Sequence, residues 1–271
     1  MTGVGLPEDG REILIEGTPY RIVDANGYRR LMVLDDPAGV HSTMALAAPD
    51  VLVTPYKLAM LRALPLAAAV RDILLIGLGG GQQAKFLRQR LPLARLVAVE
   101  VDPRIVQIAH TYFHLAPGDE RFRIVVADGL DYVRAHPDSF DLILCDGYDT
   151  RFDVPASLAG MAFYRACFRA LRSGGVMALN LDRRAATWGS AHLRRLGRIF
   201  DAHVEIPVKA YQSVLLLARD ALDLSSDALL QRAAVLETAL ELDLPAFVAG
   251  LVETGIQGRP ATRMQGEMPS G

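Results

Sequence analysis

The pattern of apolar and polar positions changes character along the chain. Residues 11–35 hold short alternating runs at 12–16, 20–24 and 30–34, separated by turn residues, which predicts a small antiparallel sheet. From residue 72 onward, continuous apolar runs alternate with segments of helical periodicity. That alternation predicts an α/β fold, a mostly parallel sheet wound with helices on both faces.

The predicted elements can be placed by residue range. Buried strands are expected at 73–76, 96–99, 122–126, 140–145 and 175–181. Helices are expected at 54–64, 82–90, 103–113, 129–135, 161–171 and 187–200. An antiparallel pair at 203–207 and 213–218 closes the sheet, and helices at 226–241 and 245–253 follow. We therefore expect a small N-terminal β-domain at 1–53, a nucleoside-binding catalytic domain at 54–220, appended C-terminal helices at 221–254 and a flexible tail at 255–271.

Composition narrows the classes of protein to consider. The chain has 271 residues, of which 51% are hydrophobic and 22% charged, so a substantial core is expected. A net charge of −2 argues against nucleic acid as a partner. The N-terminus does not resemble a signal peptide, and the apolar patch at 63–70 is too short to cross a membrane. Two cysteines in so long a chain fit a reducing compartment, so we expect a cytoplasmic protein.

A glycine-rich loop follows the first predicted strand of the parallel sheet. Its glycines are Gly77, Gly79, Gly80 and Gly81. The next strand ends at Glu100, where an acid can hold two ribose hydroxyls. Gln82 stands where dinucleotide-binding loops have their third glycine, which favours a sulfonium nucleoside over a nicotinamide cofactor.

Acids also follow the third and fourth strands. Asp128, followed by Gly129, either caps the next helix or meets the adenine amino group, and beside the glycine loop we favour adenine. Asp146 and Asp149 follow the fourth strand, at the edge where doubly wound sheets bind ligands. Paired acids can hold a cationic amine and accept its proton.

Tyrosines and histidines give weaker signals. Tyr56, Tyr148 and Tyr211 either line a pocket or pack with the hydroxyl at the surface. His41 and His192 have no partner at metal-ligand spacing, so no metal is expected.

At these residues the chain resembles the spermidine synthase family of polyamine aminopropyltransferases, and more closely its divergent bacterial spermidine-synthase-like branch. The resemblance covers about residues 11–218. The matching segments are Tyr56, Ile76–Gly81, Val99–Pro103, Asp128–Gly129, Asp146–Asp149, Pro155–Leu158, Phe163–Tyr164, Leu171–Gly175 and Ala210–Ser213. It implies a Rossmann-like, methyltransferase-type domain, a homodimer, and decarboxylated S-adenosylmethionine as co-substrate without a metal.

The resemblance also implies roles for individual residues. On the nucleoside side, the resemblance implies that Glu100 holds the ribose and that Asp128 and Gly129 lie at the adenine. On the acceptor side, it implies that Asp146 is the base and that Asp149 clamps the acceptor amine. Tyr56 and Tyr211 would line the acceptor channel, and residues 150–158 would form a gating loop. His41 lies near an expected Gln and is assigned to the nucleoside site together with the glycine loop.

The chain departs from the family at several places, one of which is the loop after the fourth strand, where the family's Asp-Ser-Thr-Asp-Pro has become Asp146, Gly147, Tyr148, Asp149, Thr150. Gly80 stands where the family has an Asp that pairs with the aminopropyl ammonium and repels the carboxylate of intact S-adenosylmethionine. The family's Glu after the tyrosine is missing, since the chain reads Tyr56, Lys57, Leu58. Lys57 would disfavour a polyamine if it faced the channel, but we expect it to be solvated instead.

Three functions follow as hypotheses. The first is an aminopropyltransferase that acts on a small-molecule di- or polyamine. The second is a methyltransferase, or aminocarboxypropyl transferase, that uses intact S-adenosylmethionine; Gly80 favours it. The third is a non-catalytic nucleoside-binding protein.

Overall fold

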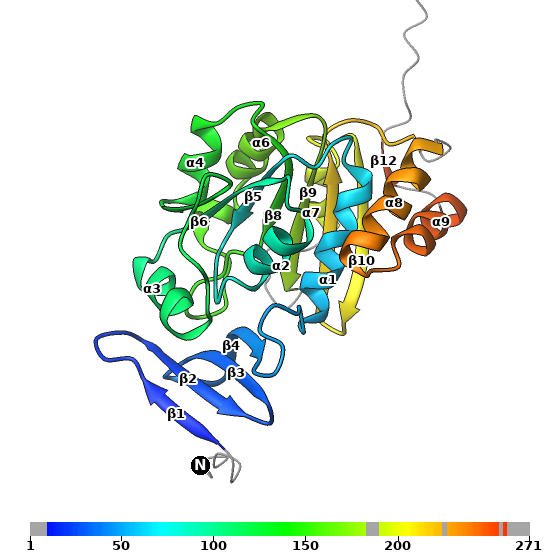
Figure 1. The fold of residues 1–271 in the computed structure, drawn as a ribbon. Coiled ribbons are helices and arrows are strands. Elements are labelled where there is room, and N and C mark those ends of the chain that lie inside the picture. Colours follow the sequence, from blue (N-terminus) through cyan, green and yellow to red (C-terminus); the bar gives the residue numbers. More distant parts are fainter. Residues whose placement is uncertain (1–9, 183–189, 224–226, 255–256, 259–271) are drawn as a thin grey trace, which may run out of the picture.

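A computed structural model of the chain describes residues 10–182, 190–223, 227–254 and 257–258. It contains a small antiparallel sheet and a large mixed sheet (Figure 1). The small sheet runs β1 (Arg11–Leu14), β2 (Tyr20–Ala25), β3 (Tyr28–Val33) and β4 (Asp36–Ala45). The large sheet has the order β12-β10-β11-β9-β8-β5-β6-β7.

The strands of the large sheet fall into a parallel and an antiparallel part. The parallel strands are β5 (Asp72–Ile76), β6 (Arg95–Glu100), β7 (Phe122–Val126), β8 (Phe140–Cys145) and β9 (Leu171–Asp182). The antiparallel strands are β10 (Ala202–Lys209), β11 (Gln212–Ala218) and β12 (Gln257–Gly258).

Helices cover both faces of the large sheet. Those described are α1 (Pro55–Met60), the 3₁₀ helix η1 (Leu61–Leu66), α2 (Gln82–Arg90), α3 (Pro103–Tyr112), α4 (Gly129–Ala135), α5 (Ala156–Ala159), α6 (Met161–Ala170), α7 (Ser190–Leu196), α8 (Asp227–Leu240) and α9 (Leu244–Thr254). In β5, Ile73 and Leu75 join the core under α2, α3 and α8, whereas Leu74 and Ile76 join the core under α4 and α6. The doubly wound α/β prediction is therefore confirmed.

Some elements differ from the sequence prediction. The strand β4 was missed, because it contains Pro37 and Gly39 and lacks apolar alternation; its pairing with β3 forms it. The predicted helix 54–64 is α1 followed by η1. The predicted helix 187–200 lies partly outside the described residues, and its described helical part is α7. Of the expected tail, Gln257–Gly258 pairs with β10 and the rest lies outside the described residues.

A buried lysine ties the small sheet to the part of the chain that forms the large sheet. Lys85 in α2 is 8% exposed, and its Nζ donates to the carbonyls of Pro49, at 2.7 Å, and Phe113, at 2.8 Å. Nζ also lies 3.5 Å from Met44 Sδ in β4. Burial lowers the pKa of Lys85. These contacts hold β4 and the segment after it over the start of α2, so the small sheet has a fixed position above the glycine loop.

No helix in the described part of the chain combines the length and apolar character that a membrane span requires.

The Lys85 contacts give a prediction for stability. Lys85→Met should lower the free energy of unfolding by about 1–3 kcal/mol, because the buried Phe113 carbonyl loses its donor. Gln89→Met, at an exposed position of the same helix, should change it by less than about 0.5 kcal/mol. Urea unfolding checks both, and equal stability of the two variants would contradict the role given to Lys85.

Candidate active site

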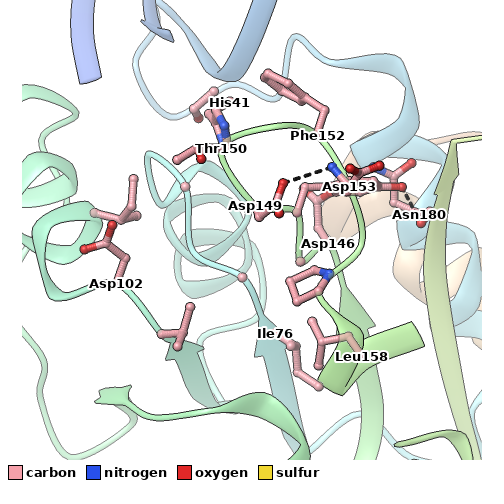
Figure 2. Close-up of a pocket in the computed structure, with 18 of the residues that line it drawn as sticks. His41, Ile76, Asp102, Asp146, Asp149, Thr150, Phe152, Asp153, Leu158 and Asn180 are labelled. Carbon is pink, nitrogen blue, oxygen red and sulfur yellow. Dashed lines mark hydrogen bonds between the residues drawn. The ribbon is translucent and has the colours of Figure 1, made fainter. Parts of the chain in front are cut away.

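A cavity of about 930 Å³ lies at the carboxyl ends of the parallel strands, roofed by β4 and the loop after β8 (Figure 2). The neighbours of β5 are β8 on one side and β6 on the other, so the sheet changes winding direction there. In open α/β sheets, ligands bind at that crevice. The residues expected from the sequence that line the cavity are His41, Tyr56, Gly77, Gly79, Glu100, Asp128, Gly129, Asp146 and Asp149.

Glu100 is fixed by backbone donors at the end of β6. Its carboxylate accepts hydrogen bonds from the N–H groups of Leu78, at 2.9 Å, and Asp102, at 3.0 Å. Burial raises the pKa of Glu100, and these donors oppose the rise. A carboxylate oxygen accepts more than one hydrogen bond, so Glu100 can hold the loop and still accept hydroxyl groups.

Asp128 caps a helix and also lies on the cavity wall. Its Oδ1 accepts from the N–H of Leu130 and thereby caps α4, and the residue also lines the cavity. Near it, Ile76 and Leu158 line the cavity with apolar side chains (Figure 2). This end of the cavity offers an apolar surface beside a polar group, which suits a flat base.

Asp146 lies against the glycine loop. Its N–H donates to the carbonyl of Ile76 at 2.8 Å. Gly77 has φ +89°, and a Cβ there would run into the carbonyl oxygen of Asp146. A glycine is therefore required where the loop meets the residue after β8.

Three side chains hold the Asp146 carboxylate. Tyr56 donates its hydroxyl to Oδ2 at 2.9 Å, and Asn180 donates Nδ2 to Oδ1 at 2.8 Å. Lys57 Nζ lies 3.7 Å from Oδ2 as an ion pair. Gln212 donates to Asn180 Oδ1 at 3.1 Å and fixes its amide orientation. Burial raises the pKa of Tyr56 well above its usual value, so its hydroxyl stays a donor.

Tyr148 secures the loop after β8 to β9. Its hydroxyl donates to the carbonyl of Asn180 at 2.9 Å and accepts from the N–H of Asp182 at 3.0 Å. Of the two alternatives that the sequence allowed for Tyr148, the structure shows that it lines the cavity, where it joins the loop after β8 to β9.

Asp149 holds its own loop. Its Oδ1 accepts from the N–H groups of Arg151, at 2.8 Å, and Asp153, at 3.0 Å, as Figure 2 shows for Asp153. Arg151 Nη2 lies 3.6 Å from its other oxygen. The loop then places Phe152 against His41 in β4, with ring centroids 4.5 Å apart. This contact roofs the cavity.

Two residues that sequence reasoning missed or misjudged are Asn180 and Lys57. Asn180 is a polar residue inside the otherwise apolar run of β9, a signal that could have identified it. The expectation that Lys57 is solvated is wrong, because it is 4% exposed in α1. A sequence cannot show which face of so short a helix is buried.

Three of the expected site residues lie off the cavity wall. Tyr211 is 63% exposed in the turn between β10 and β11, whereas Gln212 of β11 lines the cavity. Gly80 and Gly81 pack away from the cavity.

Gly80 stands where nothing larger fits. A Cβ there would lie 2.6 Å from Phe113 Cδ1 and 2.8 Å from Ser42 Oγ, and Phe113 is fully buried. Phe113 and Ser42 fill the space beside the glycine, so an acidic side chain would not fit here without a shift of its neighbours.

Two further observations concern metal ligands and thiol nucleophiles among the described residues. They contain no group of three or more His, Cys, Asp or Glu that could hold a metal ion. Burial raises the pKa of Cys145 to about 12, so its thiol stays protonated and is a poor nucleophile.

Comparison with known proteins finds relatives named as aminopropyltransferases and a relative named as a methyltransferase homolog. Residues 56–186 match the Spermine/spermidine synthase domain. A polyamine aminopropyltransferase of Chromobacterium violaceum is 34% identical over 249 residues, which cover 90% of this chain and 93% of that protein. An eEF1A lysine and N-terminal methyltransferase homolog of Drosophila melanogaster is 34% identical over 140 residues, 49% of this chain and 21% of that protein.

Solved structures share the fold. Spermidine synthase from Thermotoga maritima has a TM-score of 0.60 at 20% identity, over 81% of this chain and 72% of that one. Human methyltransferase-like protein 13, in complex with SAH, has a TM-score of 0.59 at 23% identity, over 78% of this chain and 98% of that one.

The packing at Gly80 gives a second stability prediction. Gly80→Ala should lower the free energy of unfolding by about 1–3 kcal/mol, because Phe113 must shift. Gly250→Ala, in α9 with nothing within 4 Å of its Cβ, should raise it by about 0.5–1 kcal/mol. Thermal unfolding of both variants checks this, and a Gly80→Ala protein as stable as the unchanged protein would contradict the packing described.

Proposed function

The chain belongs to the spermidine synthase family, and on that premise we propose that it transfers an aminopropyl group from decarboxylated S-adenosylmethionine to a di- or polyamine. Methylthioadenosine is the second product. The observation that carries the proposal is the contact between the glycine loop and Asp146, because it brings a nucleoside-binding loop and a proton acceptor to one end of one cavity.

In the proposed reaction the amine nitrogen attacks the methylene carbon next to the sulfonium. A C–N bond forms, the C–S bond breaks, and sulfur keeps the electron pair as methylthioadenosine leaves. The nitrogen must release a proton, and Asp146 accepts it and passes it to water. The donor carries its own leaving group, so the protein mainly aligns the two reactants and excludes water.

Several of the expected residues that line the cavity have a place in this scheme. Glu100 holds the ribose, and Asp128 with Gly129 borders the adenine beside Ile76. Tyr56 orients Asp146 through the hydroxyl contact. Asp149 acts through the loop that it caps, which covers the cavity and excludes water.

Other parts of the proposal rest on the family resemblance. We propose a homodimer and a cytoplasmic location, and the second is supported by two buried cysteines that form no disulfide. We also propose the division expected from the sequence: an N-terminal β-domain at 1–53, a catalytic domain at 54–220, C-terminal helices at 221–254 and a tail at 255–271.

A second candidate function is methyl transfer from intact S-adenosylmethionine. It is favoured by Gly80, since Phe113 and Ser42 fill the space beside it and leave no room for the acid that would repel a carboxylate. The relatedness to a protein named as an eEF1A lysine and N-terminal methyltransferase homolog points the same way.

A product assay separates the two candidates. Purified protein is incubated with equal amounts of S-adenosylmethionine and its decarboxylated form, together with a panel of di- and polyamines, and products are identified by mass spectrometry. Methylthioadenosine with an amine heavier by one aminopropyl unit supports the proposal. S-adenosylhomocysteine with a methylated amine supports the second candidate and overturns the first.

Asp146→Asn should lower kcat at least about 100-fold, because an amide cannot accept the amine proton. Nucleoside affinity should change less than threefold. Asp131→Asn, on the exposed side of α4, serves as the matched control. Steady-state kinetics and calorimetry check this, and equal losses of turnover and nucleoside binding would refute the role given to Asp146.

Glu100→Gln should weaken nucleoside binding by about 1.5–3 kcal/mol, on the order of 10- to 150-fold, through loss of a charged acceptor for the ribose. Gln retains an oxygen for the Leu78 N–H, so the glycine loop keeps one of its contacts. Calorimetric titration with methylthioadenosine measures the change. Unaltered affinity would mean that another residue holds the ribose.

A further inference from the structure

The proposed reaction gives no role to Lys57, the cation that is paired with Asp146. Lys57 follows Tyr56 in α1 and is almost wholly buried. Its Nζ lies 3.7 Å from Asp146 Oδ2, the same oxygen that accepts the Tyr56 hydroxyl. Among the described residues, Asp146 is the one carboxylate within ion-pair distance of Lys57.

A buried cation and its counter-ion are difficult to separate. Removing either partner leaves an uncompensated charge in the interior, which is strongly destabilising. Lys57 therefore remains on Asp146 when a substrate enters, and the two form a neutral pair of which Asp146 lines the cavity.

Four of the six titratable groups named around the pair carry no charge near neutral pH. The other titratable groups that face it from surrounding elements are His41, Tyr56, Cys145, Tyr148, Asp149 and Asp182. Burial lowers the pKa of His41 and raises those of both tyrosines and the cysteine, so these four carry no charge. Asp149 is occupied by its own loop and by Arg151.

An amine that reaches Asp146 therefore meets a carboxylate that already has a cation. An ammonium would be a second cation on the same carboxylate, so repulsion from Lys57 would offset much of the attraction of Asp146. An uncharged amine avoids this repulsion and has the nitrogen lone pair that attack requires.

We propose that Lys57 is a positioning residue that acts through Asp146 and makes the acceptor bind as an uncharged amine. The amine gives up its proton to solvent on binding. After the C–N bond forms, the nitrogen carries a positive charge again, and its proton passes to Asp146 and then to water. This inference rests on the proposed function only in requiring an amine as the nucleophile.

Proton release on binding tests this directly. With methylthioadenosine bound, 1,4-diaminobutane is titrated calorimetrically at pH 8 in two buffers of different ionisation enthalpy. About one proton should be released for each diamine molecule that binds, since alkylamines are protonated at that pH. Lys57→Met should release far less than one proton and bind the diamine at least tenfold more tightly.

Kinetics give a second readout that a merely structural role would not move. In the unchanged protein, KM for the diamine should fall about tenfold per pH unit between pH 7 and 9, as the uncharged fraction rises. In Lys57→Met, KM for the diamine should be lower and nearly independent of pH. In the same variant kcat should fall, and it should decrease further as the pH is lowered. Lys57→Arg should restore the behaviour of the unchanged protein.

Controls keep the outcome decisive. Lys209→Met removes an exposed lysine that lines the cavity without touching Asp146, and it should leave proton release unaltered. Lys57→Gln replaces the methionine variant if that variant does not fold. A KM that does not change with pH in the unchanged protein, or full proton release in the Lys57 variants, would overturn the inference. Proton-coupled amine binding without any aminopropyl transfer would refute the proposed function and leave the role of Lys57 standing.

Discussion

The Asp146 carboxylate is the point on which the site depends. It is a nearly buried anion at the end of β8, and it is stable there because α1 supplies a hydroxyl and an ammonium while β9 supplies an amide. These contacts join three elements that are far apart in the sequence. The same residue touches Gly77, so the position of the glycine loop and that of the acid cannot change independently. Lys85 then fixes β4 over the loop, which completes the roof.

Much of this arrangement could be predicted from the sequence. The apolar runs and glycine loop gave the parallel sheet, its helices on both faces and the edge where Glu100, Asp128 and Asp146 meet, since strand ends in such a sheet lie together. The sequence did not reveal β4, because its pairing with β3 forms it despite a polar, proline-containing sequence. Nor did it reveal that Lys57 is buried, because a helix of six residues has too little periodicity to show its inner face.

Gly80 stands where the family resemblance leads us to expect an acid. The Phe113 ring and the Ser42 hydroxyl pack around Gly80 and occupy the space of the expected charge. That change removes both an attraction for an ammonium and a repulsion for a carboxylate. The fold itself is shared by spermidine synthase and methyltransferase structures, so the fold alone does not decide which group is transferred. The acceptor end of the cavity, with Asp146 beside the glycine loop, favours chemistry on an amine.

The most direct measurement is a crystal structure of the protein with methylthioadenosine and a diamine bound. The account predicts a diamine nitrogen within hydrogen-bond distance of Asp146, about 2.7–3.2 Å, facing the sulfur of the nucleoside, with Lys57 still paired to the carboxylate. A nucleoside bound away from the glycine loop, or a diamine that does not contact Asp146, would contradict it.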